Sequence, residues 1–221
     1  MKTTWLSMML SFAACAMSSG SHAATSGAWA WQQSVQFEAD HDPSRVVLRN
    51  GTDTMNLEVI YDGLAWKQVD AWPKGKALQL AYSEKTGTVL VDPVSGKSVT
   101  VLDGLKTQPI DRLLDACLKK AVSTRDIEGC YGEAYHRWDA QMNLWYRRFM
   151  ASKDADIDTA AKESMRVAQR QWLKYRDAQF DALSDLYGHR SGTIWPVIAM
   201  RKRIALPRTR ARALASYLQV F

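Results

Sequence analysis

The spacing of apolar residues changes once along this chain, next to Asp103 and Gly104. Before that point, short runs of β-branched and aliphatic residues alternate with turn sequences such as Asn50-Gly51. After it, apolar residues recur every three or four positions over long stretches, as they do in amphipathic helices. The change predicts an α+β protein in which a small antiparallel β module precedes an α-helical bundle.

Residues 29–105 contain the short runs that we expect to form strands. These runs are Val46–Leu48, Leu57–Tyr61, Leu78–Tyr82, Thr88–Val91 and Val99–Leu102. Their lengths and spacing favour a small antiparallel sheet or sandwich. Four tryptophans, Trp29, Trp31, Trp66 and Trp72, either close a small β core or form a platform on which sugars stack, and we favour the core.

Helical spacing predicts three long helices and some shorter pieces in the second half. Pro109 suits the first turn of the first helix, and Ser123-Thr124-Arg125-Asp126 resembles the capping start of the second. A third helix places Ala161, Met165, Ala168, Trp172, Tyr175 and Leu186 on an apolar stripe and ends at Gly188. Because proline interrupts helices, Pro196 and Pro207 should bound a last helix over residues 208–218.

The first 23 residues have the pattern of an export signal. Lys2 precedes a short apolar stretch, and Ser21-His22-Ala23 forms a small-x-small cleavage site. A rival pattern, Phe12-Ala13-Ala14-Cys15, resembles a lipoprotein site, and its use would anchor the protein through Cys15. We favour cleavage after Ala23, which predicts a protein that is periplasmic or secreted.

Charge is distributed unevenly between the two halves. Residues 24–108 carry ten acidic and eight basic side chains, whereas residues 109–221 carry thirteen acidic and twenty basic ones. Six of the basic residues fall within residues 201–212. A nucleic-acid partner is not expected, since no binding motif accompanies this charge. A solvated helix face is the simpler interpretation, and an anionic surface in the cell envelope is the alternative.

Cleavage after Ala23 would leave two cysteines, Cys117 and Cys130. An even pair in an exported chain indicates a disulfide, and two free buried thiols are the alternative. Cys117 falls late in the first predicted helix and Cys130 early in the second, so an antiparallel turn would bring the sulfurs together. Closing such a loop stabilises a fold by about 3 kcal/mol in the chain-entropy model. The predicted bundle is therefore disulfide-stapled.

Polar and aromatic residues at helical spacing follow the second cysteine. They are Asp139, Asn143, Tyr146, Arg170, Trp172, Tyr175, Arg176 and Asp177. With the cysteine spacing, this pattern resembles the LprI-type lysozyme-inhibitor family over residues 109–218. The resemblance implies a small exported helical domain that binds lysozyme. Family members usually have a second cysteine pair; Phe180 occupies the third cysteine position, and no cysteine follows Cys130.

The strongest motif residues fit a structural role better than a binding role. Trp172 and Arg176 are four residues apart, so the guanidinium can lie along the indole. Asp177 lies on a different face from Arg176, so we expect it to pair with another helix and not with Arg176. Asp139, Asn143 and Tyr146 repeat a helical face and have the same interpretation.

Catalytic and metal-binding patterns are not evident, and no cofactor is expected. After removal of the signal, the histidines are His41, His136 and His189, which lack zinc-ligand spacing. The acidic run at residues 154–158 resembles a calcium loop, but Thr159 and Met165 occupy the glycine and terminal acid positions. We therefore interpret that run as a helix start, and we expect a protein that is not an enzyme.

The segment Gly188-His189-Arg190-Ser191-Gly192 is the predicted binding loop. Lysozymes use a pair of carboxyl groups in a cleft, and a loop presenting His and Arg could hydrogen-bond them. We expect a signal sequence over residues 1–23, a β-rich module over 24–106 and an LprI-like domain over 107–221 that inhibits lysozyme or a related muramidase. The alternatives are an envelope structural or adaptor module, an immunity protein against a wall-degrading toxin, and a wall-sugar hydrolase.

Overall fold

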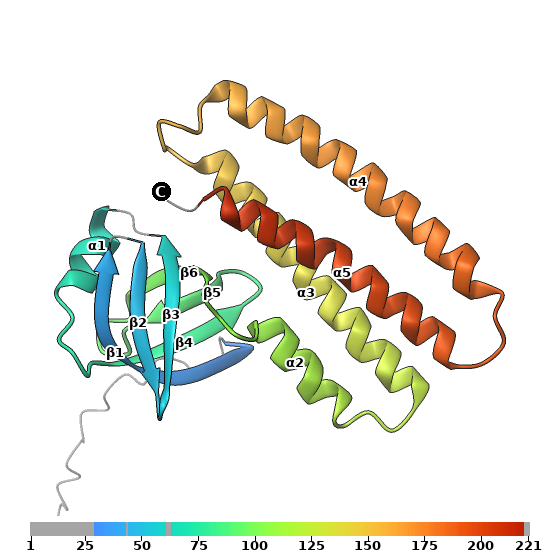
Figure 1. Cartoon of the computed structure of the whole chain (residues 1–221), viewed down its shortest axis with the longest axis horizontal. Coiled ribbons are helices and arrows are strands. Elements are labelled where there is room, and N and C mark those ends of the chain that lie inside the picture. Colours follow the sequence, from blue (N-terminus) through green and yellow to red (C-terminus); the bar gives the residue numbers. More distant parts are fainter. Residues whose placement is uncertain (1–28, 43, 61–62, 219–221) are drawn as a thin grey trace, which may run out of the picture.

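The structure is a computed structural model that describes residues 29–42, 44–60 and 63–218. The predicted signal sequence and Cys15 lie outside these residues. A β barrel forms one end of the molecule, and the helices extend away from it (Figure 1). The α+β class, with an antiparallel β module before a helical region, is confirmed.

Six antiparallel strands close the barrel. They are β1 (Trp31–Asp42), β2 (Arg45–Asn50), β3 (Asp53–Ile60), β4 (Ala77–Ser83), β5 (Gly87–Val91) and β6 (Ser98–Asp103). The strand order is β1-β2-β3-β6-β5-β4, and β1 pairs with β4 to complete the ring. Because the ring is closed, the sheet has no open edge with unpaired backbone groups. The β module is therefore a closed barrel and not a sandwich.

Side chains from alternate strand positions fill the barrel interior. Val46, Leu48, Leu57, Leu80 and Leu90 are fully buried there. The helix α1 (Gly63–Asp70) adds Val69 to this core, although the sequence predicted only strands in this region. Its eight residues are too few to show a helical period against the strand-like runs on either side.

The described tryptophan side chains of the β module, Trp29, Trp31 and Trp72, pack in different places. Trp72 is buried in the barrel core, with its ring centroid 5.6 Å from that of Phe37. Trp31 is half-buried and packs against both the barrel core and the helical core, while Trp29 packs beside Val91. The side chain of Trp66 lies outside the described part of the chain. The core role that we favoured for these tryptophans is confirmed for Trp72.

Four helices make up the second half: α2 (Pro109–Leu118), α3 (Thr124–Ala151), α4 (Thr159–Gly188) and α5 (Ile194–Ser216). Pro109 occupies the first turn of α2, as predicted. Ser123 caps α3 through a reciprocal capping box with Asp126, as predicted. Asp158 caps α4 by accepting from the Ala161 amide, which confirms that the acidic run leads into a helix start.

The prediction for the last helix was wrong, because α5 is continuous from Ile194 to Ser216 and contains Pro207. Pro196 is tolerated because it lies in the first turn, where amides have no partner within the helix. Pro207 deprives the Arg203 carbonyl of an amide donor. Its ring is buried in the helical half, so tertiary packing maintains the helix there.

The helical core forms mainly between α3 and α5. Trp138, Met142 and Trp145 of α3 pack with Ala211 and Leu214 of α5, and all five are buried. By contrast, α4 lies along the outer side of this pair (Figure 1), and its buried position is Gln169.

The prediction of an apolar stripe on this third helix was therefore only partly right, because the stripe is shorter than predicted. Met165 and Trp172 are half-buried, but Tyr175 and Leu186 are exposed. The helix lies at the margin of the molecule, and long polar side chains make many of its contacts.

The barrel and the helices share one continuous set of contacts. Tyr82 and Leu102 of the barrel belong to the same buried cluster as Trp138 and Trp145. Arg148 of α3 donates to the Thr86 carbonyl at 3.0 Å, and its guanidinium carbon lies 4.8 Å from the Trp145 ring centroid. The two halves therefore dock through a mixed apolar and hydrogen-bonded seam.

Candidate functional site

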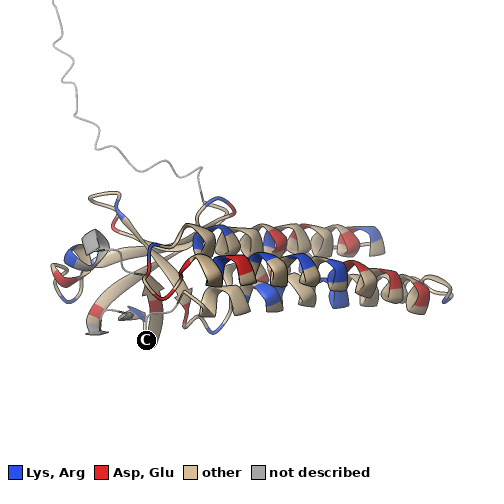
Figure 2. Cartoon of the chain, turned by 90° about the horizontal axis from the view of Figure 1, so that it is seen from above, with Lys and Arg blue, Asp and Glu red and all other residues tan. Residues whose placement is uncertain are grey.

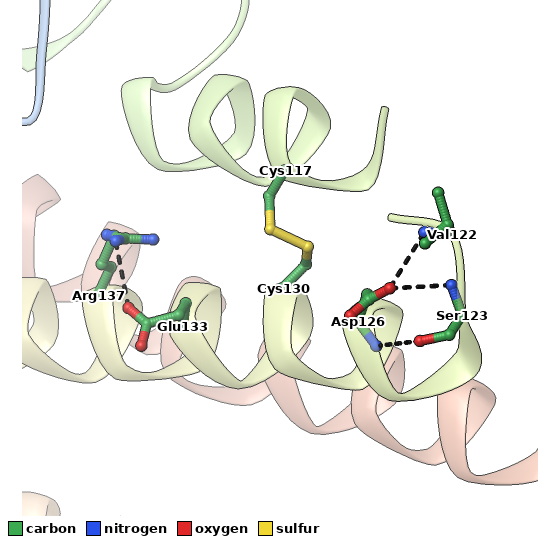
Figure 3. Close-up of a disulfide and its surroundings, with 7 residues drawn as sticks. All are labelled: Cys117, Val122, Ser123, Asp126, Cys130, Glu133 and Arg137. Atoms are coloured by element: carbon green, nitrogen blue, oxygen red, sulfur yellow. Dashed lines mark hydrogen bonds and ion pairs between the residues drawn. A yellow bond between two sulfur atoms is a disulfide. The ribbon is translucent and has the colours of Figure 1, made fainter. Parts of the chain in front are cut away.

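The disulfide between Cys117 and Cys130 joins α2 to the first turns of α3 (Figure 3). The two Cα atoms are 5.7 Å apart, and Cys130 is buried. One turn earlier on α3, Asp126 accepts from the amides of Val122 and Ser123. The capping box and the disulfide together fix the angle at which α2 meets α3, as the sequence predicted for the cysteines.

Arg176 connects α3 and α4 at the centre of the motif residues. Its terminal nitrogens lie 3.5 Å from Asp139 of α3 and 2.7 Å from Asp177, its neighbour on α4. The prediction that Arg176 and Asp177 would not pair was wrong, because the long arginine side chain curls along the helix to reach the adjacent carboxylate. Asn143 donates to the carboxylate of Asp139 at 3.0 Å and holds it in place.

The charge of Arg176 is stabilised where it lies. Partial burial opposes the charged form, but the hydrogen bond with Asp177 and the nearby carboxylate of Asp139 outweigh it and raise the pKa of Arg176. For Tyr135, burial raises the pKa, so its hydroxyl stays neutral beside this charged group. The arrangement is therefore a tight ion-pair cluster that joins α3 and α4.

Aromatic rings pack around the same cluster. The Arg176 guanidinium carbon lies 5.8 Å from the Trp172 ring centroid and 5.9 Å from that of Phe180. Arg203 of α5 approaches the Phe180 ring to 5.3 Å, and Tyr135 of α3 meets it edge-on. Phe180 thus contacts the guanidinium groups of Arg176 and Arg203 and links α3, α4 and α5.

The remaining motif residues lie apart from this cluster. Arg170 is exposed on α4, 4.0 Å from Glu163, and Tyr175 is 52% exposed. Tyr146 is half-buried against the helical core. The structure therefore gathers Asp139, Asn143, Trp172, Arg176 and Asp177, and it leaves Arg170 and Tyr175 on the outer face of α4.

The predicted binding loop lies at the end of the α4–α5 hairpin that is farthest from the barrel (Figures 1 and 2). Arg190 lies 4.5 Å from the ring centroid of Trp195 and 5.7 Å from that of Tyr187. These two rings stack with centroids 5.9 Å apart. The Trp195 indole nitrogen donates to the Ser191 carbonyl at 3.0 Å, and His189 is exposed. Stacking and hydrogen bonds therefore order the loop.

Several residues that shape this region were not identified in the sequence. Gln169 is buried and accepts from Arg210 of α5 at 2.9 Å, and burial lowers the pKa of that arginine. Arg203 donates to the Ser184 hydroxyl at 2.6 Å. These partners are at least nineteen residues apart along the chain, and no local pattern marks such pairs.

Among the described residues, no group of three or more His, Cys, Asp and Glu side chains could hold a metal ion. No helix in the described segments is long and apolar enough to cross a membrane. Ion pairs and ring contacts between helices instead define a disulfide-stapled helical domain attached to a small closed barrel. Residues 117–214 match the family model described as lysozyme inhibitor LprI. The C-terminal half of the chain belongs to this family.

One curated relative and one solved structure are similar to the chain. An uncharacterized protein of Rhizobium meliloti (strain 1021) is 32% identical over 110 residues, which cover 46% of this chain and 78% of that protein. The crystal structure of an uncharacterized protein from Burkholderia thailandensis is 26% identical and has a TM-score of 0.46. This match covers 51% of this chain and 54% of that one, about half of each.

Proposed function

We propose that the protein is a non-catalytic inhibitor of lysozyme or a related muramidase in the cell envelope. The observation that carries this proposal is the LprI match, which spans most of the helical half. In the proposed organisation, residues 1–23 direct export, residues 24–106 form the β module, to which we assign no role, and residues 107–221 bind the target. Periplasmic or secreted location follows from the predicted export signal; membrane anchoring would require a lipid on Cys15.

The α4–α5 loop is the proposed contact with the target. It projects at the distal end of the helices, where the barrel does not obstruct a large partner (Figure 2). The Nε of Arg190 donates to the Leu186 carbonyl. The two terminal nitrogens of the Arg190 guanidinium are therefore available to a carboxylate. Because stacking already orders this side chain, little conformational entropy is lost on binding.

Charge favours a target that is not strongly basic. The helical half has twenty basic and thirteen acidic side chains, so long-range forces would repel a basic lysozyme and attract an acidic muramidase. An immunity protein against a rival's wall-cutting enzyme would work by the same contacts.

The test is an inhibition titration of the mature protein against muramidases of different net charge. We expect His189→Ala combined with Arg190→Ala to raise the inhibition constant about tenfold, as for a few central contacts in an interface. Lys174→Ala, an exposed cation on the same helix pair, is the matched control and should leave inhibition unchanged. The difference between wild type and double variant should shrink at high salt.

Two results separate failure of the loop from failure of the function. If a folded double variant, checked by circular dichroism, inhibits as strongly as wild type, the loop is not the contact. If wild type inhibits none of the muramidases, the inhibitor function itself is rejected, and an envelope structural or adaptor role takes its place.

A further inference from the structure

A hollow of about 440 Å³ opens beneath the α4–α5 loop, between the distal ends of α3, α4 and α5. Leu183 and Tyr187 of α4 face Pro196, Ala199 and Met200 of α5 across it. The volume lies in the range of cavities that hold small organic ligands, and the walls are mainly apolar. We call this hollow the distal pocket.

Two arginines on the rim of the distal pocket carry charge that no carboxylate neutralises. Arg190 donates to the Leu186 carbonyl, and Arg203 donates to the Ser184 hydroxyl and the Phe180 carbonyl. Among the described residues, neither lies within ion-pair distance of an acidic side chain.

A further observation on the helix of Arg203 points the same way. Residues 186–221 contain no Asp or Glu, so the α5 wall offers no acid to these cations.

One acidic residue, Glu128 of α3, also lines the distal pocket. A ligand with several negative groups would be repelled by this carboxylate, whereas a ligand with one could place that group by the arginines. Guanidinium groups bind carboxylates through paired, charge-assisted hydrogen bonds. The distal pocket thus combines mainly apolar walls with two arginines and one carboxylate in its lining.

We propose that the distal pocket binds a small monocarboxylate with an apolar body, its carboxylate between Arg190 and Arg203 and its body against Leu183, Ala199 and Met200. This proposal goes beyond muramidase inhibition and does not rest on it, since it needs no second protein.

The test titrates the mature protein with 4-phenylbutyrate, followed through the methyl signals of Leu183, Ala199 and Met200 in nuclear magnetic resonance spectra. We expect saturable shifts confined to these signals. The neutral 4-phenylbutanol should bind about tenfold more weakly, and the cationic 4-phenylbutylamine more weakly still, because the arginines contribute charge-assisted hydrogen bonds. Equal binding of acid and alcohol, or no saturable shift with the acid, would overturn the proposal.

Single substitutions test whether Arg190 and Arg203 bind the carboxylate of the ligand. Arg190→Gln and Arg203→Gln should each weaken 4-phenylbutyrate binding roughly fivefold to tenfold. If Arg203→Gln loosens α4, Arg190→Gln still provides the test. Arg201→Gln, on the same helix but lining a different hollow, is the matched control and should bind like wild type.

The sign of the Glu128→Gln effect is decisive. For a monocarboxylate, removal of this negative charge should strengthen binding roughly twofold to threefold. Weaker binding would mean that Glu128 attracts a cationic group of the ligand, and it would reject the proposed chemistry. If Arg201→Gln and Arg203→Gln weakened 4-phenylbutyrate binding equally, the net positive charge of α5 and not a contact in the distal pocket would attract the ligand. That result would also reject the proposed site.

Discussion

Trp172 illustrates how a residue can stabilise the fold without lying in the core. Its ring is half-buried between the helical core and Arg176, whereas Trp145 of α3 is only 4% exposed. Truncation of a fully buried tryptophan costs about 3–5 kcal/mol. We therefore expect Trp172→Ala to lower the free energy of unfolding by only about 2 kcal/mol, since part of its ring already faces water.

Urea unfolding of Trp172→Ala and Trp145→Ala, measured side by side, checks this difference. Trp145→Ala should show the full core cost of about 3–5 kcal/mol. A Trp172→Ala loss as large as that of Trp145→Ala would mean that α4 packs more tightly than the structure indicates. No loss at all would leave Trp172 as a surface residue available for binding.

The Asp126 carboxylate gives a residue-scale prediction about pH. Hydrogen bonds with Ser123 and the Val122 amide lower the pKa of Asp126 below its ordinary value of 3.8. Above pH 3.8 the carboxylate stabilises the start of α3 fully. This contribution is lost as the pH falls through the lowered pKa of the folded state.

We expect the amide signals of Val122 and Ser123 to titrate together with a midpoint below pH 3.8. In Asp126→Ala this shared titration should disappear. A midpoint at or above 3.8 would show that the carboxylate does not hold these amides in solution.

At the scale of elements, the disulfide determines how firmly α2 is held. The bonded cysteines are thirteen residues apart, and a loop of this length stabilises a fold by about 3 kcal/mol through the entropy of the unfolded chain. Cys117→Ser combined with Cys130→Ser should lose about this amount in urea unfolding. Adding a reductant should destabilise wild type similarly and leave the double variant unchanged. A wild type insensitive to reductant would contradict the bond.

Local elements were predictable from the sequence, and elements decided by tertiary contacts were not. The start of α3 is encoded within four residues, Ser123 to Asp126, so its capping box was recognisable. The course of α5 through Pro207 depends on burial of that proline among distant residues. The placement of α4 depends on pairs such as Arg176 with Asp139 and Arg210 with Gln169, which sequence spacing cannot reveal.

The residues of the candidate site also divide into those that local sequence reveals and those that only tertiary contacts bring together. The motif pattern drew attention to Arg176 and Trp172, and the loop was recognised from its bracketing glycines. The distal pocket was not predicted, because Glu128, Leu183 and Met200 come from three helices that meet only in the folded molecule.

For the whole molecule, the central question is whether the barrel and the helices unfold as one unit. Gly87, the first residue of β5, has a positive φ of 70° and lies against α3. A Cβ atom there would come within 3.0 Å of side-chain atoms of Gln141 and Leu144. Gly96 has the same φ of 70°, but a Cβ atom there would meet nothing within 4 Å.

These two glycines therefore separate backbone strain from strain at the seam. Gly96→Ala should cost about 1 kcal/mol or slightly more, the penalty of a left-handed conformation at a residue other than glycine. Gly87→Ala should cost more, because its methyl group also displaces Gln141 and Leu144 of α3 and disturbs the seam near Arg148 and Thr86. In both variants, helix content and the amide signals of barrel residues should be lost at the same urea concentration, since Tyr82 and Leu102 share one buried cluster with α3 and α5. Equal costs for the two substitutions, or helices that unfold separately from the barrel, would show that the two halves are independent domains joined only by the chain.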